Sequence, residues 1–436
     1  MDNLEFCGLS KRGVDNVAEI WPGIKKAANT REKDRVNSQE QSLSIDMATS
    51  ENWVLRQELV QLYKDAIQNG LTSQHLSYPD GFNGDVRLVD ALVQFLNSYF
   101  SPLIPVQGSH IATAPGAAFA LDALLFNICD PGDGLLIASP AWNGFNWLIG
   151  VRSGVKPIFV QLENLDDAIS PKIILALEDA LHKSIAPIKG LLLANPNNPL
   201  GTCYPEEVLK SIIRFCHEKK IHLISDEIYA MSGFENPDHP DPVPFVSLLQ
   251  IDVKGMGCDL SRMHAVWSTS KDLGSSGLRV GCCITQDNGA LATGLALTSN
   301  TQVSSLAAVA TAALLTSSEL PRLLKLNAER LSESYLKIRD VLKKYCIDHI
   351  PTSRSPYVFA KIAPNLETWE EEDVIIKIFR SEGLQISMAR SYHVPENEKG
   401  WTRLNFALEP SKLDEALTRL DRGILRISQR GRTTAT

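Results

Sequence analysis

The sequence predicts an α/β protein with a large domain built on a mostly parallel sheet and a smaller second domain. Its 436 residues exceed what one ordinary core holds, so two domains are expected. In the middle of the chain, short apolar runs alternate with amphipathic stretches, which is typical of parallel strands joined by helices. After about residue 317 the pattern changes to long, charged amphipathic helices, which indicates a second domain.

The composition is that of a globular protein, with 44% hydrophobic and 22% charged residues. The net charge of -8 argues against a nucleic-acid-binding protein, which would carry a basic face. No apolar run approaches the ~20 residues that span a bilayer, and the start lacks the apolar core of a secretory signal. The eight cysteines form no C-x-x-C pair and no zinc-like spacing. We therefore expect a cytoplasmic protein that binds neither metal, membrane nor nucleic acid.

The individual elements follow from local patterns. Helices are predicted where apolar residues recur on one face, and the first of them ends at Gly70. Turn residues fill the stretch 75–84 that follows it. The predicted helices cover residues 53–70, 85–100, 205–220 and 322–345, and the predicted strands cover residues 134–139, 190–194, 221–225 and 264–268.

These elements give three segments. Residues 1–60 are expected to form an N-terminal arm and part of the small domain, residues 61–316 the large domain, and residues 317–436 the C-terminal small domain. Polar residues follow three of the predicted strands, namely Asn198, Asp226 and Ser268. Ligand groups gather at the carboxyl ends of parallel strands, so these three side chains predict one site.

Five segments carry a family resemblance in the correct order. They read "DPGDGLLIASPAWNGF" (130–145), "ANPNNPLGT" (194–202), "SDEIYA" (225–230), "STSKDLGSSGLRVG" (268–281) and "GWTRLNFA" (400–407). Together they resemble the class I/II aminotransferases, which are fold type I pyridoxal-phosphate (PLP) enzymes. The resemblance covers about residues 45–420 and implies a seven-stranded, mostly parallel sheet covered by helices, a smaller α+β domain and a PLP cofactor.

The resemblance gives roles to residues around the cofactor ring. Lys271 would hold PLP as a Schiff base, which requires an amine that can lose its proton. Asp226 would keep the pyridine nitrogen protonated so that the ring accepts electrons. Tyr229 and Asn198 would bind the ring hydroxyl, although Asn198 could also be a plain turn residue. Trp142 would stack on the ring, although a lone tryptophan is more often part of a core.

Another set of residues would bind the cofactor phosphate. Ser268 and Arg279 stand three residues before and eight residues after Lys271, as in the family. The planar, permanently charged guanidinium of arginine suits a phosphate dianion. The backbone N–H groups of Gly116, Ala117 and Ala118 would complete the phosphate site at a helix N-terminus.

The resemblance also predicts the substrate class and a partner. Arg403 matches the arginine that binds the α-carboxylate of an amino acid. Tyr78 resembles the tyrosine that reaches the cofactor phosphate of a neighbouring subunit, which would make the active unit a homodimer. The loop "YPDGFNG" is unusual in its spacing, and Phe82 could hold the equivalent position.

The reaction type depends on the segment "IDMATSENWVLRQEL" (45–59). It resembles the substrate-side A-E-N segment of 1-aminocyclopropane-1-carboxylate (ACC) synthases and related fungal carbon–sulfur lyases, with Glu51 and Asn52 matching and Ser50 in place of Ala. A helix start with a Ser or Thr cap is the alternative interpretation. We expect an eliminating enzyme that acts on a sulfur-containing amino acid, or else an aminotransferase.

A ligand-sensing domain of a transcription regulator is a hypothesis from another class. Such a protein would carry a helix-turn-helix module before this domain. The roughly 45 residues that precede the resemblance show neither that pattern nor the basic charge it needs. An enzyme is therefore the preferred interpretation.

Overall fold

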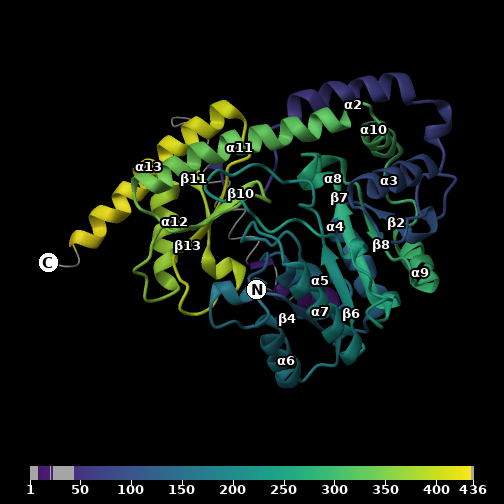
Figure 1. Ribbon diagram of the computed structural model, residues 1–436, viewed down its shortest axis with the longest axis horizontal. Helices are drawn as coiled ribbons and strands as arrows, with labels where there is room; N and C mark the ends of the chain where they lie inside the picture. The colour runs from purple at the N-terminus through teal and green to yellow at the C-terminus, as the bar shows by residue number, and fades with distance from the viewer. Residues whose placement is uncertain (1–7, 20, 23–43, 434–436) are drawn as a thin grey trace.

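The computed structural model describes residues 8–19, 21–22 and 44–433. It consists of a large part centred on one sheet and a smaller part formed mainly by the C-terminal third of the chain (Figure 1). Of the predicted N-terminal segment, residues 1–60, residues 1–7, 20 and 23–43 lie outside the described residues. Within the described ranges, no helix combines the length and apolar character needed to cross a membrane.

A seven-stranded sheet forms the centre of the large part, in the order β2-β8-β7-β6-β5-β3-β4. Strand β8 runs antiparallel to both its neighbours, and the other neighbouring pairs are parallel. The predicted mostly parallel, seven-stranded sheet is thereby confirmed. Its strands are β2 (Ile111–Ala114), β3 (Gly134–Ile137), β4 (Lys156–Phe159), β5 (Ile188–Ala194), β6 (His222–Asp226), β7 (Met263–Ser268) and β8 (Gly281–Ile284).

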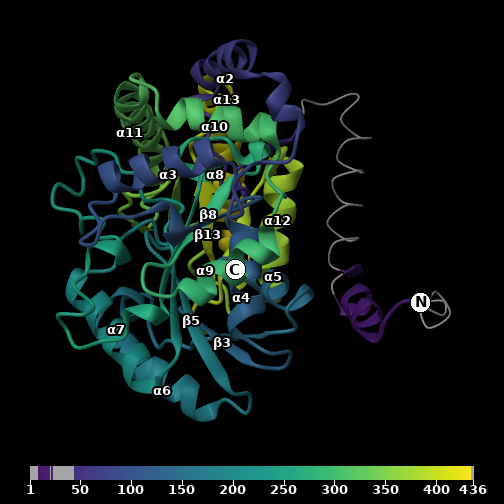
Figure 2. The same cartoon turned by 90° about the vertical axis from the view of Figure 1, so that its right-hand side faces the viewer.

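Strand β5 illustrates why these apolar runs form a buried sheet. Its side chains alternate between the two faces of the sheet. Leu191 and Leu193 pack in a cluster with residues of α6 (Ile173–Lys183) and α7 (Glu206–Lys219). Leu192 packs in a different cluster with α4 (Ala117–Ile128) and α5 (Phe145–Val151). The two helix layers lie on opposite sides of the strands, as Figure 2 shows. Because both faces are covered, the strand needs a continuous apolar run.

The helices before and after the sheet follow the predicted patterns. Helix α2 (Arg56–Gly70) ends at Gly70, as expected. Helix α3 (Val86–Tyr99) is capped by the preceding Asp85, whose carboxylate accepts hydrogen bonds from two backbone N–H groups of the first turn. Helices α9 (Gly289–Ser299) and α10 (Ser305–Leu315) are the remaining long helices described for the large part.

The smaller part contains a four-stranded sheet in the order β12-β13-β10-β9. Strand β1, from the N-terminal side of the chain, pairs in parallel with β11 of this part. The domain limits at residues 60 and 316 stay predictions. The elements are β1 (Ile45–Asp46), α11 (Leu320–Lys344), β9 (His349–Ile350), β10 (Tyr357–Lys361), α12 (Glu370–Ser381), β11 (Leu384–Gln385), β12 (Ser387–Met388), β13 (Trp401–Asn405) and α13 (Pro410–Thr433).

Candidate active site

A cavity of about 480 Å³ lies at the carboxyl ends of β5, β6 and β7, and Arg403 of β13, in the smaller part, lies in its wall. This is the edge of the sheet where polar side chains were predicted to meet. The structure brings ten of the predicted site residues into its wall: Ala117, Ala118, Trp142, Asn198, Asp226, Tyr229, Ser268, Lys271, Arg279 and Arg403.

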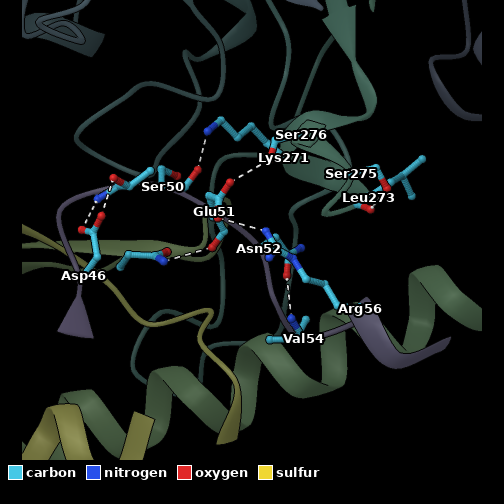
Figure 3. Close-up of polar contacts among 12 residues, drawn as sticks. Asp46, Ser50, Glu51, Asn52, Val54, Arg56, Lys271, Leu273, Ser275 and Ser276 are labelled. Carbon is cyan, nitrogen blue, oxygen red and sulfur yellow. Dashed lines mark hydrogen bonds and ion pairs between the residues drawn. The ribbon is translucent and has the colours of Figure 1, made fainter. Parts of the chain in front are cut away.

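Lys271 lies in the short helix α8 (Thr269–Asp272), directly after strand β7. Its Nζ donates a hydrogen bond to the backbone carbonyl of Ser50, which belongs to the segment between β1 and α2 (Figure 3). Burial, with a smaller contribution from the charge of Arg403, lowers the pKa of Lys271 to about 8. About a tenth of the amine is therefore neutral at pH 7, and the neutral amine is the form that attacks a carbonyl.

Asp226 and Glu227, adjacent in the chain, have opposite surroundings. The Glu227 carboxylate accepts hydrogen bonds from Ser225 Oγ at 2.8 Å, Ser247 Oγ at 2.6 Å and the backbone N–H of Leu248 at 2.8 Å. Asp226 lines the cavity, and its Oδ1 is buried without a hydrogen-bond partner within the described part of the chain. Burial raises the pKa of Asp226 to about 7. Glu227 thus has a structural role, whereas Asp226 has an oxygen available for a cationic group.

The buried Glu227 carboxyl predicts a pH-dependent stability. Burial raises its pKa to about 7, so from pH 5 to 7 this carboxyl is protonated to a greater extent in the native state than in the unfolded state. This carboxyl therefore contributes less stability as the pH rises. Relative to the unaltered protein, Glu227→Gln should gain up to about 1.4 kcal/mol of unfolding free energy per pH unit in this range.

Urea unfolding of both proteins at several pH values measures this difference. The comparison is needed because His222 and His264, whose pKa values burial lowers to about 4 and about 3, contribute the opposite slope. A stability difference that is independent of pH would contradict the prediction.

Arg403 is buried and held from several sides. Its Nη1 donates to Asn198 Oδ1 at 2.8 Å, and its Nη2 donates to the carbonyl of Ala48. The guanidinium carbon lies 4.9 Å from the ring centre of Tyr357 and 5.2 Å from that of Tyr392. Its Nε is buried without a partner among the described residues. A fixed guanidinium with a free donor in the cavity wall is suited to bind a carboxylate.

The opposite end of the cavity contains an anion site. Gly116 precedes helix α4 with a φ of 87°, and a Cβ at this position would lie 2.4 Å from Arg279 Nη2. Arg279 donates hydrogen bonds to the carbonyls of Pro115 at 2.9 Å and Ser276 at 2.8 Å. The hydroxyl of Ser268 caps helix α8 close by. The guanidinium, the hydroxyl and the N-terminus of α4 together form a site for a phosphate group.

Gly116→Ala should therefore weaken binding of a phosphorylated ligand. The positive φ and the contact with Arg279 both oppose a side chain here, and strain of this kind costs about 1–3 kcal/mol. We expect an affinity for PLP at least about fivefold lower, measured by absorbance titration of the ligand-free protein. Gly289→Ala is the matched control, because a Cβ at that position meets nothing within 4 Å. Equal affinities of the two variants would contradict this assignment.

Gly116 lies next to the cavity at the phosphate site without lining it, and four further predicted residues do not line it either. Glu51 is bound by Ser276 Oγ at 2.7 Å and forms an ion pair with Arg56 at 3.0 Å (Figure 3). Asn52 is buried, and its Nδ2 donates to Asn327 Oδ1 at 2.8 Å. The exposed fractions of Tyr78 and Phe82 are 84% and 52%. Their roles toward substrate or partner stay predictions.

Several cavity residues were not predicted from the sequence. Ala48 and Tyr392 contact Arg403, and Ser276 lines the cavity. Ser50 was noticed only as a departure from the family segment, but it contacts both Lys271 and Tyr229. The position of Ser276 between Lys271 and Arg279 could have indicated a role.

The fold and this site define the class of protein, an enzyme with a lysine that can bind a carbonyl cofactor next to a phosphate site and a carboxylate site. Residues 44–420 match the family model described as aminotransferase class I and II. The chain belongs to this family, so it is a PLP-dependent enzyme that acts on an amino acid.

Three relatives illustrate the similarity. The protein named probable aminotransferase aclI of Aspergillus oryzae is 54% identical over 95% of this chain and 97% of its own length. The protein named 1-aminocyclopropane-1-carboxylate synthase 1 of Oryza sativa subsp. indica is 33% identical over 78% of this chain and 70% of its own length. The fold is also similar to a mutant aspartate aminotransferase of Thermus thermophilus, with a TM-score of 0.74 and 21% identity over 95% of this chain and 99% of the other.

The residues present fit PLP. Lys271 supplies an amine with a lowered pKa, and the unpartnered Asp226 Oδ1 suits a protonated ring nitrogen. The space that a Cβ at Gly116 would fill, next to Arg279, suits the phosphate. When bound, PLP would supply the electron sink that stabilises negative charge at the substrate Cα.

Proposed function

We propose that the protein cleaves the carbon–sulfur bond of an α-amino acid whose β carbon carries sulfur. Arg403 binds the α-carboxylate, Lys271 removes the Cα proton, and Asp226 holds a proton on the cofactor ring nitrogen. These steps are shared by all reactions of this class, so the choice among them depends on the substrate side chain.

The apolar wall of the cavity is the observation that carries this proposal. Phe145, Leu121 and Leu148 line the cavity beside Trp142, which would stack on the cofactor ring and lies edge to face with Phe145 at 5.4 Å between ring centres. A wall of this kind favours an uncharged side chain, because a charged one would lose its hydration. A thioether is uncharged and apolar and contains a leaving group.

The proposed reaction balances as a hydrolytic β-elimination. Lys271 takes the Cα proton, and the electron pair of that C–H bond forms a Cα–Cβ double bond as the Cβ–S bond breaks. The sulfur leaves as a thiolate and takes up a proton. The remaining three-carbon fragment adds water and yields pyruvate and ammonia. The similarity to an ACC synthase supports chemistry at the side-chain carbons within this branch of the family.

Transamination is the second candidate. It is favoured by the name of the Aspergillus oryzae relative, a probable aminotransferase. The same residues would act up to removal of the Cα proton, and the proton would then be returned to the cofactor instead of a group leaving the substrate.

A product assay distinguishes the two. The purified holoenzyme is mixed with S-substituted cysteines and with ordinary amino acids, each with and without a 2-oxo acid acceptor. We expect thiol, ammonia and pyruvate in equal amounts from an S-substituted cysteine without an acceptor. A 2-oxo acid that forms only when the acceptor is present, without release of a thiol, would overturn the lyase proposal in favour of transamination.

We also propose that the active unit is a homodimer. The stretch 76–86 exposes four apolar side chains, with exposed fractions of 84% for Leu76 and Tyr78, 52% for Phe82 and 48% for Val86. Exposed apolar residues that cluster in this way mark interaction surfaces. A second copy of the chain would cover them and bring Tyr78 to the phosphate site of its partner.

Mixing two inactive variants tests this arrangement. Lys271→Ala lacks the lysine, and Tyr78→Ala lacks the tyrosine. If Tyr78 acts in the partner's site, a mixed dimer contains one complete site, and activity should return when the two variants are refolded together. A monomer in light scattering, or no recovery from two variants that do form mixed dimers, would contradict the proposal.

A further inference from the structure

Ser50 contacts two residues of the site through two different groups. Its backbone carbonyl accepts a hydrogen bond from Lys271 Nζ, and its Oγ accepts one from Tyr229 Oη at 3.0 Å. The exposed fractions of Ser50 and Tyr229 are only 4% and 2%. The contact between the two hydroxyl groups is therefore shielded from water. A hydrogen bond in such a buried environment is stronger than one exposed to solvent.

The position of Ser50 is fixed by neighbouring contacts of its segment. The Met47 carbonyl accepts from the backbone N–H of Asn405 at 2.9 Å, and the Glu51 carbonyl accepts from Asn405 Nδ2 at 3.0 Å. The backbone N–H of Trp53 donates to the carbonyl of Ala407 at 2.8 Å. The segment is thus tied to β13 and the residues after it, and the Ser50 hydroxyl is held beside Tyr229.

The direction of this hydrogen bond has a chemical consequence. A tyrosine hydroxyl has a single proton to donate, and here Tyr229 donates it to Ser50. A serine hydroxyl can rotate and act as donor or acceptor. If Ser50 donates to Tyr229 Oη instead, the Tyr229 proton becomes available to an acceptor in the cavity, such as the ring oxygen of PLP.

We propose that Ser50 is a positioning residue whose hydroxyl donates to Tyr229 and thereby directs the Tyr229 proton to the ring oxygen of the bound cofactor. The donated bond makes Tyr229 a stronger donor, because hydrogen bonds in a chain polarise one another. A stronger donor stabilises negative charge on the ring oxygen. This role is independent of whether the enzyme eliminates or transaminates.

Spectroscopic titration of the holoenzyme tests the proposal without an activity assay. The absorption band of cofactor bound to Lys271 changes with pH, and its apparent pKa depends on the charge of the ring oxygen. Ser50→Ala should raise this apparent pKa by about 0.3–1 unit, as expected for loss of one hydrogen bond. Ser50→Thr, which keeps a hydroxyl, should restore it. Neither substitution removes the backbone carbonyl that Lys271 contacts.

Tyr229→Phe supplies the decisive control. If Ser50 acts through Tyr229, Ser50→Ala should cause no further change of the apparent pKa in the Tyr229→Phe protein. The other charged or titratable groups near Ser50 and Tyr229 are unaltered in this comparison: Asp226, Lys271, Tyr357, Tyr392 and Arg403.

Two outcomes would overturn the proposal. One is an unchanged apparent pKa in Ser50→Ala, and the other is an equal shift in the presence and absence of the Tyr229 hydroxyl. Thermal unfolding of each ligand-free variant checks that the proteins are folded. If Ser50→Thr does not fold, the comparison of Ser50→Ala with and without Tyr229→Phe still decides the question.

Discussion

Lys271→Ala is expected to bind PLP without forming a covalent bond and to lose activity by about 10³-fold or more. The substitution removes both the nucleophile that holds the cofactor and the base that takes the Cα proton, and a positioned base alone contributes about 10²–10⁴-fold. The absorption band of the lysine-bound cofactor near the visible edge should disappear. After borohydride reduction, the cofactor should stay attached to the unaltered protein and dissociate from the variant.

Two controls separate the amine from its charge. Lys271→Arg keeps a positive charge but cannot lose its proton, so it should lack the band as well. Lys254→Ala removes an exposed lysine that pairs with Asp287 at 3.0 Å, and it should retain the band. If the band survived in Lys271→Ala, another lysine would hold the cofactor.

Asp226→Asn is expected to lower the rate by at least about 10²-fold while PLP still binds through Lys271, the magnitude known for loss of one preorganised electrostatic contact. Asn cannot carry the negative charge that keeps a ring nitrogen protonated, so negative charge at the substrate Cα is less well stabilised. Exchange of the Cα proton of an amino acid into deuterated water, followed by NMR, measures this effect before any group leaves.

Glu227→Gln is the matched control for Asp226→Asn. The two carboxyls are adjacent in the chain, but Glu227 is bound by Ser225, Ser247 and Leu248 and does not line the cavity, whereas Asp226 does. Glu227→Gln should therefore alter stability while its rate of proton exchange stays close to that of the unaltered protein. Equal losses of proton exchange in the two variants would contradict the role of the Asp226 carboxylate in keeping the cofactor ring nitrogen protonated.

The sequence predicts the centre of this protein well. Strands β3, β5, β6 and β7 lie within a few residues of their predicted positions, because burial on both faces requires continuous apolar runs that are visible locally. The short strands β2, β4 and β8 were not predicted. Like β3 each has four residues, but β3 continues the apolar run "LLIA", whereas β8 reads "GCCI", whose glycine and cysteines do not distinguish a strand from a loop.

Contacts between distant segments could not be predicted from local patterns. Ser50 and Tyr229 are separated by 179 residues, and Arg56 and Ser276 approach Glu51 from different sides of the site. The sequence indicated Lys271 and Arg403 because each lies in a compact signature. The partners of Glu51 and Ser50 depend on how two parts of the chain pack, and neither periodicity nor residue type records that packing.

Residues 48–50 also affect how much of the chain an active protein needs. The carbonyl of Ala48 binds Arg403, and the carbonyl of Ser50 binds Lys271. A shortened polypeptide that starts at residue 55 would retain all five signature segments. It would lack residues 48–50, whose carbonyl groups bind Arg403 and Lys271. A gene model that begins there would be recognised by its motifs but would encode an impaired catalyst.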